Sequence, residues 1–221
     1  MKNLGFTLAE VLITLVIIGV IAAMTVPTLM NNTNAQEYRS ALKKAISGLN
    51  QALTLHYALE GSTASDYSTA GLIVDNVFKV RMSTVDNSRF SEMVTNSVTT
   101  GGVNNGAINA SACAAPANGS NAATSVFTTA DGMKFCVTNY SSANADAQNS
   151  VCNSYNTIPC WNANNTPNLF IDVNGDRKPN TVTSSANRPK DIYPALIYSQ
   201  KVVPFGDAAQ EVMFDKQVST N

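Results

Sequence analysis

Three oxygen-bearing side chains stand at alternate positions in the segment that runs from Asp172 through Asn174 to Asp176. This spacing is typical of the first half of a calcium-binding loop, because Ca²⁺ prefers carboxylate and amide oxygens as ligands. Asn180 stands where the ninth residue of such a loop would contribute another oxygen. The segment is therefore a candidate Ca²⁺ site, and Ca²⁺ is the one cofactor that the sequence suggests.

The second half of the calcium-loop pattern is incomplete. Arg177 occupies the position at which the sharp turn needs glycine, and Thr183 occupies the position of the bidentate acid. The alternative interpretation is a tight Asn-Gly-Asp turn between two strands, stabilised by hydrogen bonds from its own side chains. The sequence leaves both interpretations open.

The four cysteines all lie in the second half of the chain, at Cys113, Cys136, Cys152 and Cys160. None belongs to a Cys-x-x-Cys pair, so a zinc or redox site has little support. An even number of cysteines in an exported domain favours two disulfides, for which three pairings are open.

Residues suited to catalysis are scarce. His56 is the only histidine, and because no nucleophile accompanies it at a recognisable spacing, we expect it to be a surface or packing residue. The chain has no phosphate-binding loop, no Gly-x-Ser-x-Gly segment and no pair of metal-binding histidines. The 14 Lys and Arg residues are balanced by 15 Asp and Glu residues, so there is no basic field for nucleic acid. We expect neither an enzyme nor a nucleic-acid-binding protein.

The most apolar segment of the chain is Val11–Val26, which contains no charged residue. At about 1.5 Å per residue, a helix of this length nearly spans a hydrocarbon core of about 30 Å. A secretory signal would place a longer leader before the run and a small-residue cleavage site after it, whereas Pro27 and Thr28 follow here. A buried core helix would show polar positions in every turn. The sequence therefore predicts a membrane helix.

Glu10 stands at the head of this apolar run. A carboxylate within a membrane costs several kcal/mol unless it is paired, so such a residue indicates a function. The alternative is a first-turn residue in the headgroup zone, favoured there by the helix dipole. The physics of the isolated helix does not decide between the two.

The segment Gly-Phe-Thr-Leu-Ala-Glu-Val-Leu-Ile-Thr-Leu, from Gly5 to Leu15, resembles the prepilin cleavage and methylation motif. This motif is found in type IV pilins and in the pseudopilins of type II secretion, and the resemblance covers about residues 1–30. It implies that a prepilin peptidase cuts after Gly5 and methylates the new amine of Phe6. It also implies that Glu10 neutralises the N-terminal amine of a neighbouring subunit, which would supply the partner that a buried carboxylate needs.

The resemblance further implies a structural subunit of a filament, with copies of the chain or other pilins as partners. An inner-membrane assembly platform and membrane lipid would be further partners. Before assembly the subunit would cross the inner membrane once, with its head outside the cytoplasm, and would then enter a pilus or a periplasmic pseudopilus. Pro27 stands where many members of the family carry a proline that kinks the helix. The alternative is a membrane-tethered extracytoplasmic binding protein that forms no filament, but a simple tether needs neither the Gly5–Phe6 junction nor Glu10.

The helix is predicted to continue to Glu60, because an apolar stripe recurs at three- and four-residue spacing. The stripe consists of Tyr38, Leu42, Ile46, Leu49, Leu53 and Tyr57. Gly61 is expected to end the helix as a C-cap. The predicted organisation is a leader over residues 1–5, a membrane or filament-core helix over 6–30, an amphipathic helix over 31–60 and a globular head over 61–221.

The head is predicted to be a small antiparallel sheet packed on the helix, which gives an α+β fold. Val126–Thr129 and Met133–Thr138 flank an Asp-Gly turn and predict a hairpin with one apolar face. Leu169–Val173, Ile192–Tyr198 and Lys201–Phe205 predict further strands. The segment from Gly101 to Ser125 is rich in small polar residues and is predicted to be a long surface loop.

Overall fold

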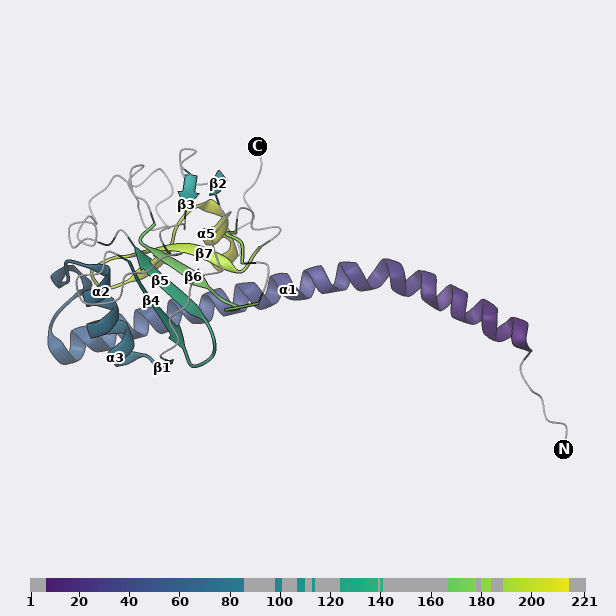
Figure 1. Ribbon diagram of the computed structural model, residues 1–221, viewed down its shortest axis with the longest axis horizontal. Helices are drawn as coiled ribbons and strands as arrows, with labels where there is room; N and C mark the ends of the chain where they lie inside the picture. The colour runs from purple at the N-terminus through teal and green to yellow at the C-terminus, as the bar shows by residue number, and fades with distance from the viewer. Residues whose placement is uncertain are drawn as a thin grey trace, which may run out of the picture. The chain divides into compact units, whose positions relative to one another are not determined.

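The computed structural model describes residues 7–85, 98–100, 107–109, 113, 124–138, 140, 167–177, 180–183 and 189–214. The chain divides into two compact units, Met1–Glu37 and Tyr38–Asn221. A long helix at the N-terminus is followed by an antiparallel sheet of six strands, so the predicted α+β fold class is confirmed (Figure 1).

The helix α1 runs from Leu8 to Glu60 and continues through Pro27. Gly61 ends it with a positive φ of 70° and donates its N–H to the Tyr57 carbonyl at 2.9 Å. A residue without a Cβ adopts this left-handed conformation at low cost. The predicted extent of the helix and its C-cap are therefore confirmed, whereas the kink at Pro27 stays a prediction.

In the second unit, α1 contributes one face to the core of the head. Leu42, Ile46, Leu49 and Leu53 of the predicted stripe are buried, but Tyr57 is 48% exposed, so its assignment to the core face was wrong. A helix of 3.6 residues per turn continues the 42-46-49-53 sequence at position 56. His56 therefore occupies the core position instead.

The main sheet has the strand order β1-β4-β5-β6-β7-β8, and every neighbouring pair is antiparallel. Its strands are β1 (Thr84–Val85), β4 (Thr124–Thr129), β5 (Lys134–Thr138), β6 (Leu169–Asp172), β7 (Ile192–Ile197) and β8 (Val202–Pro204). The predicted hairpin is β4–β5, with Gly132 at a φ of 88° in its turn. The other three predicted strands correspond to β6, β7 and β8.

The predicted apolar face of the hairpin, which carries Met133, Phe135 and Val137, is confirmed, and the opposite face of the sheet carries a second hydrophobic cluster. Phe127, Phe135 and Ile171 belong to the larger cluster, together with the buried residues of α1. Cys136 and Phe170 point to the opposite face and belong to the second cluster. All residues of β5 are buried, because both faces of the strand are covered.

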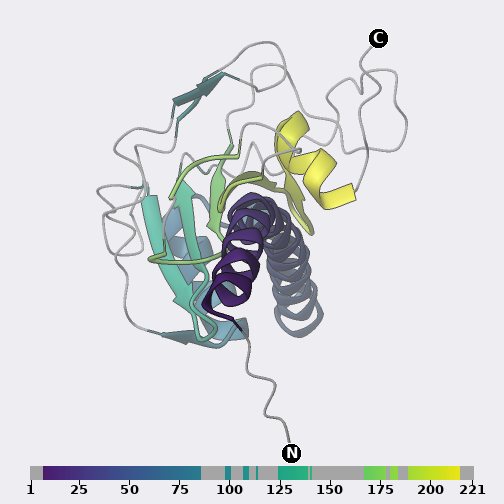
Figure 2. The same cartoon turned by 90° about the vertical axis from the view of Figure 1, so that its right-hand side faces the viewer.

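Helical segments complete the larger cluster. α2 (Ala70–Ile73), a π-helical turn (Val74–Phe78) and α3 (Lys79–Arg81) follow one another after a 3₁₀ turn at Ala64–Asp66. The C-terminal helix α5 (Asp207–Phe214), yellow in Figure 2, adds buried apolar side chains to the same cluster. This C-terminal helix was not predicted from the sequence.

The segment from Gly101 to Ser125 is not wholly a surface loop. β2 (Val98–Thr100) pairs with β3 (Ala107–Asn109) in a small antiparallel sheet. Cys113 is fully buried, and Thr124 and Ser125 already belong to β4. The low-complexity composition concealed these elements, because serine, threonine and asparagine carry no clear periodicity.

Two polar contacts join α1 to the sheet within the second unit. The Asn50 amide accepts the Val202 N–H at 2.6 Å and donates to the Val202 carbonyl at 3.2 Å, so that it acts as a short additional partner for the edge strand β8. Lys44 forms an ion pair of 2.7 Å with Asp131 in the turn of the β4–β5 hairpin.

Candidate functional site

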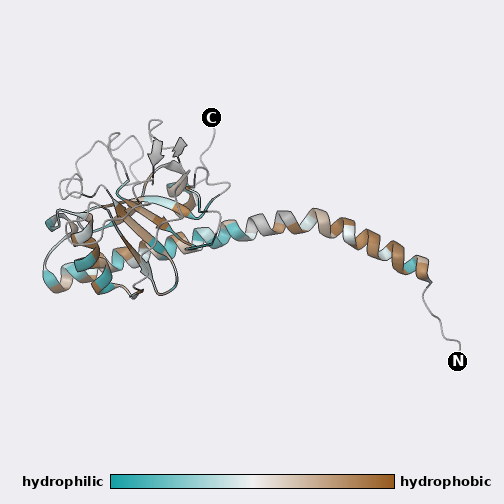
Figure 3. Ribbon diagram, in the orientation of Figure 1, coloured by the Kyte–Doolittle hydropathy of each residue, from teal (hydrophilic) through white to brown (hydrophobic). Residues whose placement is uncertain are grey.

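The first part of α1 exposes a continuous apolar surface. Leu8–Val26 comprises 19 residues, none of the segment is buried within the structure, and it is long and apolar enough to cross a membrane. Figure 3 shows this part of the helix as predominantly hydrophobic. At about 1.5 Å per residue its length approaches the ~30 Å of a hydrocarbon core. A helix that is apolar on all sides needs lipid or other helices around it.

Glu10 begins this apolar helix and is held by Thr7. The carboxylate Oε2 accepts the Thr7 N–H at 2.9 Å and the Thr7 hydroxyl at 2.8 Å, while the Glu10 N–H donates to the Thr7 hydroxyl at 3.3 Å. This is a capping box, which satisfies backbone donors at the start of a helix reciprocally. The Thr-x-x-Glu spacing in the sequence indicates a capping box, but Thr7 was not among the predicted site residues.

The capping box leaves the Glu10 carboxylate able to bind a cation. Both bonds from Thr7 go to the same oxygen, and a carboxylate can accept about four hydrogen bonds in total. An ammonium group from another chain could therefore pair with Glu10 without displacing Thr7. The capping box thereby fixes where on the helix surface this charge is presented.

A family model described as the prokaryotic N-terminal methylation motif matches residues 1–26. This chain carries the prepilin signature of type IV pilins and pseudopilins. The signature supports a pilin-like precursor with a single membrane anchor, which is a structural type of protein. No curated protein and no solved structure matches the chain significantly. Of the prepilin residues, Gly5 and Phe6 lie outside the described residues.

The head contains a second polar site, at the ends of β6 and β7. Asp172 is 0% exposed, and its Oδ1 accepts the N–H groups of Asn174 and Gly175 at 3.1 and 3.0 Å. Its Oδ2 is buried and has no hydrogen-bond partner among the residues that the structure describes. A buried polar atom without a partner costs about 1–3 kcal/mol, so its retention calls for an explanation.

Asp191 is the second buried acid of this site, and it was not among the Ca²⁺ ligands predicted from the sequence. It is 0% exposed and accepts the N–H of Asn180 at 2.7 Å and that of Thr181 at 2.8 Å. Burial and then the charge of Asp191 raise the pKa of Asp172 to about 8, against the opposing effects of its hydrogen bonds and of Lys134. Because nearly twenty residues separate the two acids along the chain, no local sequence pattern indicates that they share a site.

The remaining predicted Ca²⁺ ligands lie at the margin of this acidic pair. The Asp176 side chain is 82% exposed and pairs with Lys134. Asn180 has a positive φ of 49°, and its side-chain amide is placed to donate to the Arg177 carbonyl at 2.7 Å. Both residues thus shape the loop, as the turn interpretation expects.

The acidic pair, which comprises Asp172 and Asp191, fits a hard divalent cation better than a transition metal. Within the described segments, no three His, Cys, Asp or Glu side chains converge to hold a metal ion. Further ligands would have to be amide and carbonyl oxygens such as those of residues 173–177 and 180–182, which suit Ca²⁺ and do not suit zinc. The residues that would hold the ion are Asp172, Asp191 and Asn174.

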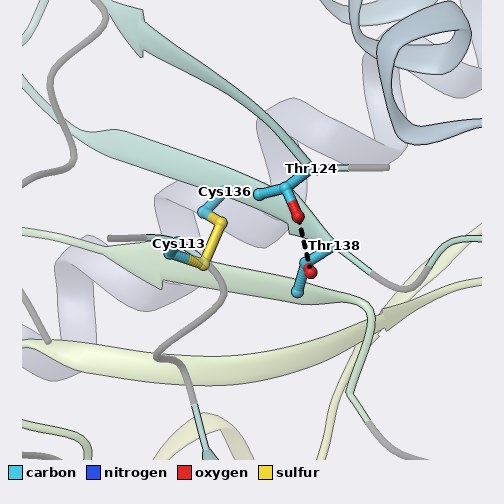
Figure 4. The surroundings of a disulfide bond; sticks show 4 residues. All are labelled: Cys113, Thr124, Cys136 and Thr138. Carbon is cyan, nitrogen blue, oxygen red and sulfur yellow. Dashed lines mark hydrogen bonds between the residues drawn. A yellow bond between two sulfur atoms is a disulfide. The ribbon is translucent and has the colours of Figure 1, made fainter. Parts of the chain in front are cut away.

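A disulfide joins Cys113 to Cys136 on the outer face of β5, as Figure 4 shows. The prediction of a disulfide is confirmed for this pair, whereas Cys152 and Cys160 lie outside the described residues. Both joined sulfurs belong to the second hydrophobic cluster. The bond therefore ties Cys113 to the face of the sheet opposite α1.

His56 is a buried packing residue, as one of the two expected roles proposed. Its Nε2 lies 2.7 Å from the Tyr67 hydroxyl and 2.9 Å from the Ser62 hydroxyl. Burial lowers the pKa of His56, and the nearby Arg81 charge lowers it further. The group fixes the turn that follows α1, and among the described residues no acid bonds to the Nδ1 of His56 to orient it as a base.

Proposed function

We propose that this chain is a structural subunit of a type IV pilus or type II secretion filament. It is made as a precursor, cut by a prepilin peptidase after Gly5 and methylated at Phe6. The observation that carries the proposal is the prepilin signature at the start of an exposed apolar helix whose first turn holds one carboxylate, Glu10. The subunit resides in the inner membrane before assembly, and an assembly platform then transfers its N-terminal helix into the helical bundle of the filament.

In this proposal, the Glu10 carboxylate pairs with the methylated amine of Phe6 in a neighbouring copy. Thr7 supplies two hydrogen bonds to Glu10 in the stored subunit and keeps its carboxylate in position. Hydrophobic burial between the Leu8–Val26 segments holds the filament, while the pairing of charges sets the axial register. Contacts of this head-to-tail kind repeat without closing and produce a filament.

Peptide mass spectrometry tests the processing step. The chain is expressed in bacterial membranes with an active or an inactive prepilin peptidase, together with Gly5→Leu and the control Gly19→Ala. Gly19 lies in α1, and an added Cβ there would meet nothing within 4 Å. We expect an N-terminus at Phe6 with one methyl group for the wild type and for Gly19→Ala only. A wild-type chain that remains uncut beside an active peptidase would support a plain membrane tether.

The assembly step is tested separately, with chains that have been cleaved. Glu10→Gln retains the shape of the side chain but removes its charge, and Glu37→Gln removes one acid further along the same helix. We expect Glu10→Gln to abolish filaments that are collected by centrifugation and seen by electron microscopy. Normal filaments from Glu10→Gln would contradict the assigned pairing.

We propose as a second function that the acidic pair binds Ca²⁺ and stabilises the head. The buried Oδ2 of Asp172 beside the buried carboxylate of Asp191 favours this proposal. A bound cation would neutralise the pair and join the ends of β6 and β7. Calorimetric titration of the full chain in detergent with CaCl₂ tests it. We expect Asp191→Asn to remove Ca²⁺ binding, whereas the control Asp75→Asn binds Ca²⁺ as the wild type does. A wild type that shows no heat of binding and no gain in thermal stability with CaCl₂ would refute the Ca²⁺ site.

A further inference from the structure

Lys134 lies beside the acidic pair on the neighbouring strand. It stands directly opposite Asp172 in the antiparallel register of β5 and β6. Residues opposite each other in this way have Cβ atoms about 4.5–5.5 Å apart and share a face of the sheet. Only 9% of the Lys134 side chain is exposed. A nearly buried ammonium group is therefore built into the wall of the site.

The surroundings hold Lys134 in this place. Its Nζ pairs with Asp176, which follows Asp172 in the same loop. The loop cannot move closer to the hairpin, because the backbone of Gly175 lies against the Gly132 carbonyl so closely that an added Cβ would collide. The ammonium group and the loop carboxylates are thus kept together by backbone packing and by their opposite charges.

The effect of Lys134 on the binding of a divalent cation follows from the balance of buried charge. Asp172 and Asp191 carry two negative charges when ionised, and Lys134 supplies one positive charge. A divalent cation added to this group would leave a buried excess of one positive charge, whereas without Lys134 the charges would cancel. Asp176, which pairs with Lys134, is 82% exposed, and Arg177 and Lys190 are exposed as well. Water and salt screen these three charges, so they are left out of the balance of buried charge.

We propose that Lys134 is an internal competitor of the divalent cation, which weakens Ca²⁺ binding at the acidic pair. This inference rests on the proposed Ca²⁺ function. Lys134 keeps the site partly neutralised when Ca²⁺ is scarce, so the head folds without the ion. It also shifts the affinity toward the range of about 10⁻⁴–10⁻³ M that is usual for extracellular Ca²⁺ modules.

Calorimetric CaCl₂ titration of the full chain in detergent tests this role with two substitutions at the position. Lys134→Met removes the charge and keeps most of the stem, whereas Lys134→Arg keeps the charge. A charge within a few ångströms changes the binding of another ion by at least about tenfold. We therefore expect Lys134→Met to bind Ca²⁺ at least about tenfold more tightly and Lys134→Arg to stay within about threefold of the wild type.

A matched control removes one positive charge elsewhere in the head. Lys44 pairs with Asp131 in the hairpin turn, so Lys44→Met alters the net charge equally without touching the acidic pair. We expect its Ca²⁺ affinity to stay within about threefold of the wild type. If Lys44→Met gains as much affinity as Lys134→Met, the effect is one of overall charge and the inference is overturned.

The remaining outcomes separate the inference from the proposal beneath it. Wild-type binding with equal or weaker binding by Lys134→Met would make Lys134 a structural residue and would overturn the inference alone. No Ca²⁺ binding by either protein would overturn both. If Lys134→Met folds only with Ca²⁺, the Ca²⁺ concentration at half-folding replaces calorimetry, because a ligand stabilises the state that binds it. Because the half-folding concentration contains the folding penalty as well as the dissociation constant, the titration is repeated in a stabilising osmolyte that folds the variant without Ca²⁺. A dissociation constant of the folded variant no lower than that of the wild type under the same conditions would refute the competition.

Discussion

Replacing Asn50 by alanine is predicted to weaken the attachment of α1 to the edge of the sheet. The Asn50 amide makes two hydrogen bonds to the backbone of Val202, at 2.6 and 3.2 Å, in a partly buried position. Each such bond contributes about 0.5–1.5 kcal/mol, which gives about 1–3 kcal/mol for the pair. Alanine is a better helix former by about half a kcal/mol. The expected net loss in the free energy of unfolding is about 0.5–2.5 kcal/mol.

The assay is urea unfolding of the full chain in detergent, followed by near-ultraviolet circular dichroism, which reports packing in the head. Thr54→Ala is the matched control, because Thr54 lies one turn later and bonds only to the Asn50 carbonyl within the same helix at 2.9 Å. We expect the control to change stability by less than about 0.5 kcal/mol. An Asn50→Ala chain as stable as the control would refute the inference that Asn50 serves as a partner for β8.

Three further predictions concern the head. Gly175→Ala should cost at least about 3 kcal/mol and Gly132→Ala about 1 kcal/mol, because both need positive φ but only the first substitution collides with a neighbouring carbonyl; equal losses in urea unfolding would contradict the close contact. His56 has a lowered folded pKa, so stability should be complete above pH 6.5 and should fall as the pH drops below it; melting between pH 7.5 and 5 should show this fall reduced in His56→Gln. Replacing Cys113 and Cys136 together by alanine should cost about 3 kcal/mol, from a sequence separation of 23 residues, and a loss below about 1 kcal/mol in denaturant would exclude a stabilising role.

The N-terminal helix and most strands could be predicted from the sequence because each carries a local signal. The apolar run, the three- and four-residue stripe of α1 and the Asp-Gly turn all depend on neighbouring residues. The strand β5 shows where such signals end. Lys134 and Thr138 look like a solvent-facing row, yet both are buried because a second layer covers that face. The sequence of β5 alone does not indicate that this second layer is present.

The polar site could be predicted only in part, for the same reason. Asp172 and Asn174 form a local pattern, whereas Asp191 joins them through the pairing of β6 with β7. Asn50 likewise resembled a surface residue of the helix until its contact with a strand far along the chain was known. Contacts of this kind depend on tertiary structure, which a single sequence does not display.

The order of the main sheet bears on how the head reaches its final form. From β4 to β8, every strand of the main sheet pairs with the next described strand along the chain. The hairpins β4–β5 and β7–β8 join segments of low sequence separation, whereas β5 pairs with β6, and β6 with β7, across longer stretches of the chain. Pairings of low sequence separation form faster than distant ones, so we expect the two hairpins to form before the sheet is complete. The contacts of residues 38–64 with the C-terminal part of the head, such as those of Asn50 with Val202 and of Ala64 with Ser199, join residues that are far apart in the sequence, and we expect their formation to limit the folding rate.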